Sequence, residues 1–311
     1  MEGRNSAHLC VGLSVAALVA AIPVAAAGQD LPAETAADRA DSRLSRLEQQ
    51  DRDFGPIRVS GAAPGVTPPF SLRVSLPFTY NTNVGNFENG GKDDFHATPS
   101  VRLDYSRPTG AFVVYARAAA DGDIYIDYDD SNASTLSGRL GIRWEEPGLG
   151  PLKPYFQYSP TIIYSGGFSD SAVTLHDLTV GVGGAIPLNN ITFAFDLQGT
   201  RREATLPGSE QDRVRLGLNF SGSVTRTIAW SIDQTAARRD YTGGANDGRC
   251  DTNLLTVAGI SAALNPEAAA SGAAAIFLHL NVSYERNLSN RDGKDYSVWD
   301  IGPTLTLRTA F

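Results

Sequence analysis

The residues best suited to catalysis in this sequence are His279, Asn281 and Ser283, at alternate positions of one stretch. A histidine and a serine can act as base and nucleophile, provided that a hydrogen bond joins them. Apolar and polar residues alternate throughout this stretch, which predicts a β-strand. Positions four apart on a strand are separated by roughly 13 Å, too far for that hydrogen bond. We therefore expect these three side chains to line a polar surface, and we expect no enzyme.

Acidic residues gather at a second place, and the set comprises Asp121, Asp123, Asp127, Asp129 and Asp130. Carboxylates are the ligands that divalent cations prefer, but this spacing is not that of a known calcium loop. We expect a solvated loop, with loose contact to a divalent cation as the alternative. Phosphate-binding glycine loops, zinc-ligand spacings and nucleotide motifs are absent from the sequence, so we expect no metal site and no cofactor.

A third set consists of charged residues that occupy the polar positions of alternating stretches: Arg102, Arg117, Arg139, Asp196 and Asp233. The chemistry of such isolated charges depends on where the surrounding elements place them. We therefore turn to those elements.

The alternation of apolar and polar residues continues from Phe70 to Phe311 and predicts about twelve strands. The last stretch, SVWDIGPTLTLRTAF, carries Trp299 and Phe311 at opposite ends of its apolar face. Two aromatic residues about 12 positions apart on a tilted strand match the two interfaces of a bilayer. The apolar faces extend over Leu72–Tyr80, Ala97–Tyr105, Phe112–Tyr128, Leu136–Trp144, Phe156–Tyr164, Leu178–Ile186, Ile191–Leu197, Val214–Val224, Ile228–Ile232, Asn253–Leu264, Ile276–Tyr284 and Ser297–Phe311.

The connections between these strands are alternately short and long. Those after the second, fourth, sixth and eighth strands are mostly short, whereas those after the odd-numbered strands are mostly longer and polar. An even strand count with this alternation is typical of a transmembrane barrel, and a secreted sandwich would not show it. The tenth strand alternates poorly, and the turn after it, near Asn265 to Ser271, is longer than this rule predicts.

The N-terminal part of the chain predicts export. Arg4, the apolar run Leu9–Ala21 and the small residues Ala25–Ala27 indicate a signal peptide over residues 1–27. Residues 28–69 are expected to form a polar periplasmic tail or short helix, then a Pro/Gly linker. The barrel is expected over 70–311, with Cys250 as the one cysteine of the mature chain.

The final strand with its terminal Phe311 resembles the last strand of bacterial outer-membrane β-barrels, a porin-like class. The resemblance covers Phe70 to Phe311 and implies an all-β, antiparallel, up-and-down transmembrane barrel with short periplasmic turns. It implies location in the outer membrane, contact with its lipid and lipopolysaccharide, and recognition of Phe311 by the barrel assembly machinery. The net charge of -8 argues against a nucleic-acid partner.

The resemblance predicts the fold and location of the protein more specifically than its function. We expect a passive channel for small hydrophilic solutes. A non-conducting accessory barrel, for instance in surface-polysaccharide export, is the first alternative, and an outer-membrane hydrolase is the second. In the lumen we expect Arg102, Arg117 and Arg139 to lie across from Asp196 and Asp233, forming a charged constriction. A ladder of salt bridges that closes the lumen is the alternative arrangement.

Overall fold

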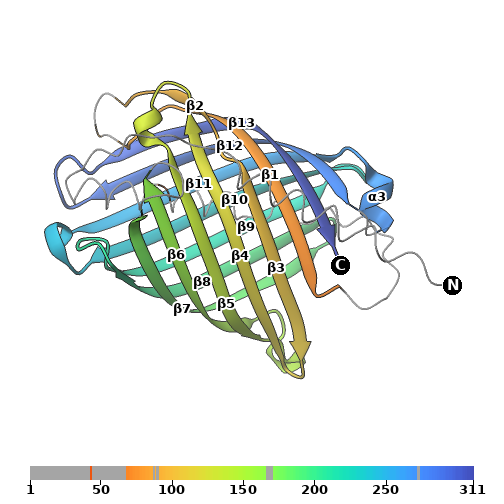
Figure 1. Cartoon of the computed structure of the whole chain (residues 1–311). Coiled ribbons are helices and arrows are strands. Elements are labelled where there is room, and N and C mark those ends of the chain that lie inside the picture. Colours follow the sequence, from red (N-terminus) through yellow and green to blue (C-terminus); the bar gives the residue numbers. More distant parts are fainter. Residues whose placement is uncertain (1–42, 44–67, 87, 89–90, 166–170, 272–273) are drawn as a thin grey trace.

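The computed structural model describes residue 43 and residues 68–86, 88, 91–165, 171–271 and 274–311 (Figure 1). The expected signal peptide lies outside these residues. So does the expected tail and linker over 28–69, apart from Arg43, Pro68 and Pro69.

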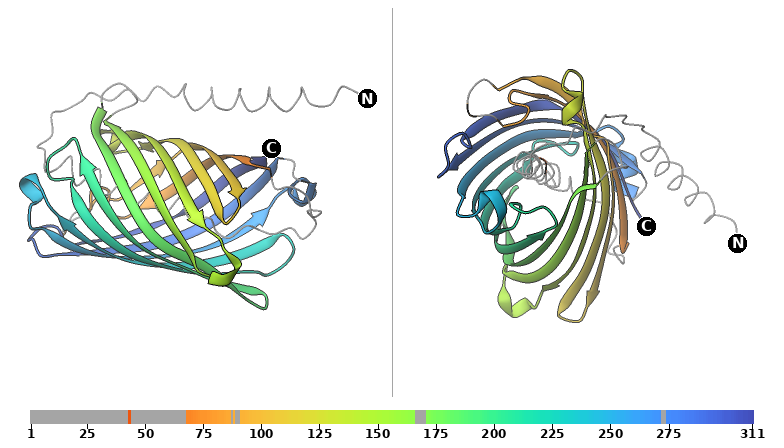
Figure 2. Two further views of the ribbon diagram at one scale, coloured as in Figure 1. Left: turned by 90° about the horizontal axis from the view of Figure 1, so that it is seen from below. Right: turned by 60° about the vertical axis from the view of Figure 1, so that its left-hand side comes forward.

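The fold is a closed β-barrel in which antiparallel strands follow one another in chain order (Figures 1 and 2). The last strand pairs with the first, with Leu72 opposite Thr309 and Asn81 opposite Asp300, and this pairing closes the ring. The strands are β1 Phe70–Asn81, β2 Asp94–Ala97, β3 Ser100–Thr109, β4 Phe112–Tyr125, β5 Ala133–Trp144, β6 Lys153–Ser165, β7 Ser171–Leu188, β8 Ile191–Ala204, β9 Gln211–Ser223, β10 Ile228–Tyr241, β11 Cys250–Ala263, β12 Ala275–Ser289 and β13 Tyr296–Ala310.

Two of these elements, β2 and β3, are segments of one barrel strand. Both pair with β1 on one side and with β4 on the other. The ladder is interrupted at Thr98 and Pro99, where proline has no N–H to donate. The barrel therefore has twelve strands, which confirms the expected fold.

The outer face of the barrel is apolar and the inner face is polar. Leu280 is 59% exposed on the outside, whereas the next residue, Asn281, lines the interior. Thr179, Thr235 and Asn253 are buried inside the ring, where they face other polar groups. This arrangement is the reverse of a water-soluble barrel and is the one expected of a barrel that spans a bilayer. Among the described residues, no helix is both long and apolar enough to cross a membrane.

Aromatic side chains form two groups near the two ends of the outer face. At one end, which we call the Phe311 end, the rings of Phe70 and Phe311 stack with centroids 5.9 Å apart, and those of Phe193 and Phe220 lie 4.9 Å apart. At the far end, Tyr284 packs on Trp299 at 4.7 Å. Such girdles mark the membrane interfaces of transmembrane barrels, and Trp299 and Phe311 lie in opposite girdles as expected.

The connections differ between the two ends of the barrel. At the Phe311 end, two residues join β3 to β4, two join β7 to β8 and four join β9 to β10. At the far end, the connections range from five residues between β6 and β7 to twelve between β1 and β2. The eleven-residue connection between β11 and β12 is the main exception, and it contains the short helix α3 Pro266–Ser271.

One expected strand boundary needs correction, and one strand with a weak sequence pattern is confirmed. The strand expected to reach Tyr128 ends at Tyr125, where the side chain of Asn132 accepts the Tyr125 N–H and a 3₁₀ turn follows. The tenth strand, which alternates poorly in sequence, is a regular strand, β11, paired along its length with β10 and β12. Its pattern is weak because Leu255 and Val257 are buried inside the ring.

Candidate functional site: a charged lumen

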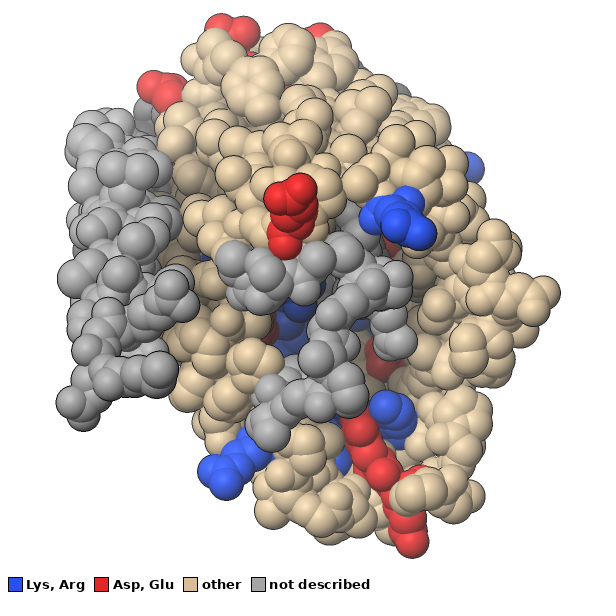
Figure 3. Space-filling view, turned by 90° about the vertical axis from the view of Figure 1, so that its right-hand side faces the viewer, with Lys and Arg blue, Asp and Glu red and all other residues tan. Residues whose placement is uncertain are grey.

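The barrel encloses a cavity of about 920 Å³ that side chains of most of its strands line. Figure 3 looks along the barrel from the Phe311 end and shows basic and acidic side chains within the hollow. Basic residues outnumber acidic ones in this lining, by ten to five. The basic residues are Arg73, Arg102, Arg117, Arg139, Arg143, Lys153, Arg202, Arg213, Arg215 and Arg308, and the acidic ones are Asp104, Asp121, Asp177, Asp196 and Asp300.

Four of the five charged residues that the sequence analysis places in the lumen line this cavity: Arg102, Arg117, Arg139 and Asp196. Asp233 is 7% exposed and is not part of the lining. Its carboxylate accepts a hydrogen bond of 3.0 Å from the side chain of Asn219 on β9. The proposed constriction therefore draws on Asp196 more directly than on Asp233.

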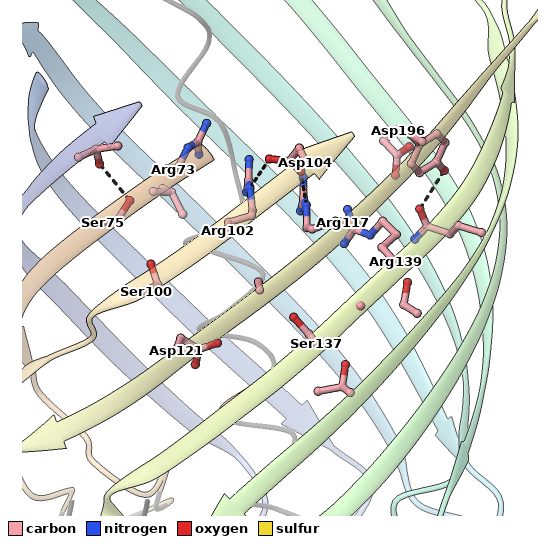
Figure 4. Close-up of a pocket in the computed structure, with 18 of the residues that line it drawn as sticks. Arg73, Ser75, Ser100, Arg102, Asp104, Arg117, Asp121, Ser137, Arg139 and Asp196 are labelled. Atoms are coloured by element: carbon pink, nitrogen blue, oxygen red, sulfur yellow. Dashed lines mark hydrogen bonds and ion pairs between the residues drawn. The ribbon is translucent and has the colours of Figure 1, made fainter. Parts of the chain in front are cut away.

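Asp104 bridges two of the expected lumen arginines. Its carboxylate accepts one hydrogen bond from Arg102 at 2.8 Å and one from Arg117 at 2.7 Å (Figure 4). The pairing of Asp104 with these arginines was not predicted from the sequence, but the length of the β3–β4 turn could have indicated its Arg117 half. Because two residues join Thr109 to Phe112, Asp104 and Arg117, each five positions from that turn, lie opposite one another.

Asp196 is held by Tyr155 from β6. The Tyr155 hydroxyl lies 2.8 Å from a carboxylate oxygen of Asp196 and 2.9 Å from the amide oxygen of Gln198. A Cβ on Gly181 would lie 2.5 Å from the Tyr155 ring, so a larger residue at position 181 would displace the tyrosine. Arg139 and Arg215 also interact electrostatically with Asp196, so acidic and basic groups are not confined to separate walls.

Further ion pairs stiffen the lumen. Arg202 makes a two-bond contact with Asp177, at 2.7 and 2.8 Å, and Arg213 lies 3.9 Å from the same carboxylate. Bidentate pairs of this kind combine charge with fixed geometry. Some of the lumen charge is therefore neutralised within the wall.

At the Phe311 end, Glu145 lies in the turn between β5 and β6, next to Arg143 and to Lys153 at 3.2 Å. Burial by itself raises the pKa of this carboxyl. Hydrogen bonds from Arg143 and Lys153, together with their positive charges, lower the pKa by more than burial raises it, so the net shift is downward. Glu145 therefore stays ionised and offsets basic charge at this mouth.

Arg43 is the least expected residue of the lumen. Its side chain is 2% exposed and bonds three residues of the inner wall: Asp121 at 2.5 Å, Asp123 and Thr135. The expectation that Asp121 and Asp123 belong to a solvated loop was wrong, because alternate positions of β4 both point inward. Nothing in the local sequence around Arg43 signals this contact, which joins residues about 80 positions apart.

The residues considered first for catalysis, His279, Asn281 and Ser283, all line the cavity from β12, as expected of a polar surface. Among the residues that the structure describes, no group of three or more His, Cys, Asp or Glu side chains is arranged to hold a metal ion.

No family model and no curated protein matches the chain. Solved structures to which it is similar include the translocator domain of autotransporter NalP from Neisseria meningitidis, with 17% identity, a TM-score of 0.44 and coverage of 87% of this chain and 98% of that one. A bacterial polysaccharide outer membrane secretin gives 12% identity, a TM-score of 0.42, and coverage of 79% and 100%. An anion-selective porin from Comamonas acidovorans has 11% sequence identity and a TM-score of 0.39, with coverage of 78% of this chain and 98% of that one.

Likenesses at these identities and TM-scores carry no argument about what the chain does. The assignment of the fold rests instead on the strand pairing and on the apolar outer face. By these criteria the chain is a closed, twelve-stranded, antiparallel transmembrane β-barrel.

Proposed function

We propose that this protein is an outer-membrane channel through which small hydrophilic solutes pass by diffusion. The observation that carries the proposal is the polar, charge-lined cavity of about 920 Å³ inside a barrel with an apolar outer face. Side chains nearly fill a barrel of eight strands, and sixteen or more leave a wide aqueous channel. A barrel of twelve strands should therefore hold a narrow path whose selectivity depends on the charges along it.

The location and assembly of the protein are part of this proposal. We propose that residues 1–27 direct export and are removed, and that the barrel inserts among outer-membrane lipid and lipopolysaccharide. Its outer band of apolar side chains between two aromatic girdles supports membrane insertion. The barrel assembly machinery is the proposed partner of Phe311.

Single-channel recording tests the channel proposal directly. Purified full-length protein is added to a planar lipid bilayer under a constant voltage, and the current is recorded. We expect discrete conductance steps that are small compared with those of sixteen-stranded porins. A bilayer that contains inserted, folded protein and stays insulating would contradict the proposal.

A second candidate is a barrel that does not conduct, and the position of Arg43 favours it. This residue precedes the barrel in sequence by more than twenty positions, yet its guanidinium is buried among Asp121, Asp123 and Thr135 inside the ring. A side chain held there narrows the path. The two candidates differ in whether solutes can pass while this contact exists.

The variant Arg43→Ala separates the two candidates. For an open channel, wild-type protein conducts and the variant conducts somewhat more, because a buried side chain is removed from the path. For a closed barrel, wild type is silent and the variant conducts, which would overturn the channel proposal. Arg226→Ala, which removes the same charge from an exposed turn, is the matched control and should behave as wild type.

Removal of one partner from a buried ion pair costs about 3–5 kcal/mol, because the other charge stays buried without compensation. Folding of Arg43→Ala must therefore be checked by its migration on gels before and after heating, since a closed barrel resists unfolding by detergent.

A further inference from the structure

One row of inward-facing residues in the far half of the barrel changes from polar to apolar along its length. Asp121 on β4 lies directly opposite Thr135 on β5. Thr135 lies directly opposite Ile163 on β6, and Ile163 lies directly opposite Val173 on β7. Together with the next inward-facing residues of β4 and β7, this row forms what we call the docking wall: Asp121, Asp123, Thr135, Ile163, Val173 and Leu175.

Arg43 occupies the polar part of the docking wall. Its guanidinium bonds the carboxylates of Asp121 and Asp123, and its Nε donates to the hydroxyl of Thr135. The side chain of Arg43 is 2% exposed, and its backbone is α-helical. A helical residue that precedes the barrel in sequence therefore lies inside the ring, against β4 and β5.

The apolar part of the docking wall is almost fully excluded from solvent. Ile163, Val173 and Leu175 form a hydrophobic cluster, and each of them is at most 5% exposed. Ala204 and Leu206 pack against this cluster and are themselves only partly buried. Because burial of apolar surface is favourable, an apolar side chain in the lumen beside this cluster is stabilised there.

On the other side of β4, the inner wall is polar. Ser100 on β3 lies directly opposite Asp121, and the hydroxyl of Thr98 donates to a carboxylate oxygen of Asp123 at 2.7 Å. A helix that is held at Arg43 can therefore bury apolar side chains toward β6 and β7, but not toward β3.

The sequence around Arg43 has the pattern that such a wall would bind. Ala40 stands three positions before Arg43 and Leu47 stands four positions after it, so an α-helix places all three on one face. Leu44 borders this face. Glu48 falls on the other side of the same helix, away from the carboxylates of the wall. A helix through Arg43 thus presents a positive charge beside apolar side chains, as the docking wall presents carboxylates beside an apolar cluster.

We propose that the docking wall binds an amphipathic α-helix formed by residues 36–47 of this chain, inside the lumen. Arg43 holds the helix to Asp121 and Asp123, while Leu44 and Leu47 pack toward the hydrophobic cluster on β6 and β7. The short helix expected within residues 28–69 then belongs to the interior of the barrel. Docking goes beyond the proposed channel function and can be measured whether or not the protein conducts.

The helix runs from the far end of the barrel toward the Phe311 end. Asp123 lies two positions from the far end of β4, whereas Pro68 leads into β1 at the Phe311 end. The 24 residues between Arg43 and Pro68 can span this distance, since even an α-helix rises about 1.5 Å per residue.

Photo-crosslinking of the full-length protein, folded in detergent, tests this docking. The photoreactive amino acid p-benzoylphenylalanine replaces Leu47, the sample is irradiated, and crosslinked peptides are identified by mass spectrometry. We expect crosslinks to β6 or β7 within one polypeptide, because Leu47 faces the hydrophobic cluster. The same replacement of Glu48 is the matched control, and it should give few such crosslinks because this residue lies on the other side of the helix.

The dependence on Arg43 provides a second measurement. Arg43→Ala, combined with the photoreactive group at position 47, should lower the yield of these crosslinks about tenfold, because the buried ion pairs that hold the helix are lost. Arg226→Ala removes an arginine from an exposed turn and should leave the yield unchanged. Gel migration before and after heating shows whether each variant is folded.

A cysteine pair tests the same contact without a bulky ring. Leu47→Cys combined with Ile163→Cys, in a Cys250→Ser background, should form a disulfide under mild oxidation. Glu48→Cys combined with Ile163→Cys should not form one.

The outcomes separate docking from conduction. Crosslinks from position 47 to β6 or β7, in a protein that does not conduct, support the docking of this helix and contradict the channel. Conduction by a folded protein in which position 47 gives neither these crosslinks nor a disulfide with position 163 supports the channel and overturns the docking. Equal yields from positions 47 and 48 would also overturn it, because the segment would then present no fixed face to the wall.

Discussion

At the scale of single residues, the face of the strand on which a side chain lies matters more than its neighbours in sequence. Leu280 and Asn281 are consecutive in β12, yet the first is 59% exposed on the outer face and the second lines the cavity. A charge introduced at these two positions enters two different solvents, hydrocarbon and water.

Leu280→Arg should therefore be costly and Asn281→Arg should be tolerated. An arginine on the lipid face near the middle of the membrane costs about 2–4 kcal/mol, whereas an arginine in the lumen can be hydrated. The measurement is the free energy of unfolding in urea for barrels refolded into lipid vesicles. Equal losses in the two variants would show that Leu280 does not face lipid.

At the scale of the elements, the barrel depends on the contact between its first and last strands. The N–H of Phe311 donates to the carbonyl of Phe70 at 3.0 Å, and the N–H of Phe70 donates back at 3.2 Å. Their rings stack on the outer face, and Phe70 also contacts Tyr105 at 5.0 Å. The last residue of the chain thus belongs both to the closing ladder and to an aromatic girdle.

Phe311→Ala should lower the amount of assembled barrel, because it removes this ring from the closing strand, and deletion of Phe311 should lower it further by removing two backbone hydrogen bonds. Phe220→Ala, in the same girdle but on β9, is the control for loss of an aromatic ring alone. The measurement is the fraction of protein in membranes that changes its gel migration on heating. If both alanine variants assemble equally well, Phe311 has no special role in assembly.

At the scale of the whole molecule, the two ends of the barrel differ. Phe70 and Phe311 lie at one end, and Cys250, the first residue of β11, lies at the far end, where its N–H donates to the side-chain oxygen of Asn290 in the neighbouring connection. In an outer-membrane barrel of this kind, short turns face the periplasm and longer loops face the exterior. The proposed orientation therefore exposes Cys250 to the medium.

An impermeant thiol reagent should label Cys250 on intact cells, since this residue is half-buried and not fully enclosed. The variant Cys250→Ser should abolish labelling. Combined with Arg226→Cys, in the turn between β9 and β10, it places the cysteine at the opposite end and should be labelled only after the outer membrane is opened. The reverse result for these two proteins would invert the orientation.

The sequence by itself determined the architecture, and the reason is that alternation is a local property. The alternation within each strand shows which of its side chains face lipid. The number of strands, their two faces and the aromatic residues at both ends of β13 could therefore be predicted before any contact was known. The same alternation placed Arg102, Arg117, Arg139 and Asp196 inside the ring. The alternation is weak in β11, where apolar Leu255 and Val257 face inward, although a strand was still predicted there.

Only the tertiary structure decided which of these charges meet. Register around the ring sets Arg308 against Arg73 and Arg73 against Arg102, and it turns Asp104 into a bridge between two arginines. The burial of Arg43 between Asp121 and Asp123 joins segments about 80 residues apart, and no periodic pattern encodes such a contact. Alternation predicts the face of the sheet on which a side chain lies. The partners of that side chain depend on the register of the twelve strands in the closed ring.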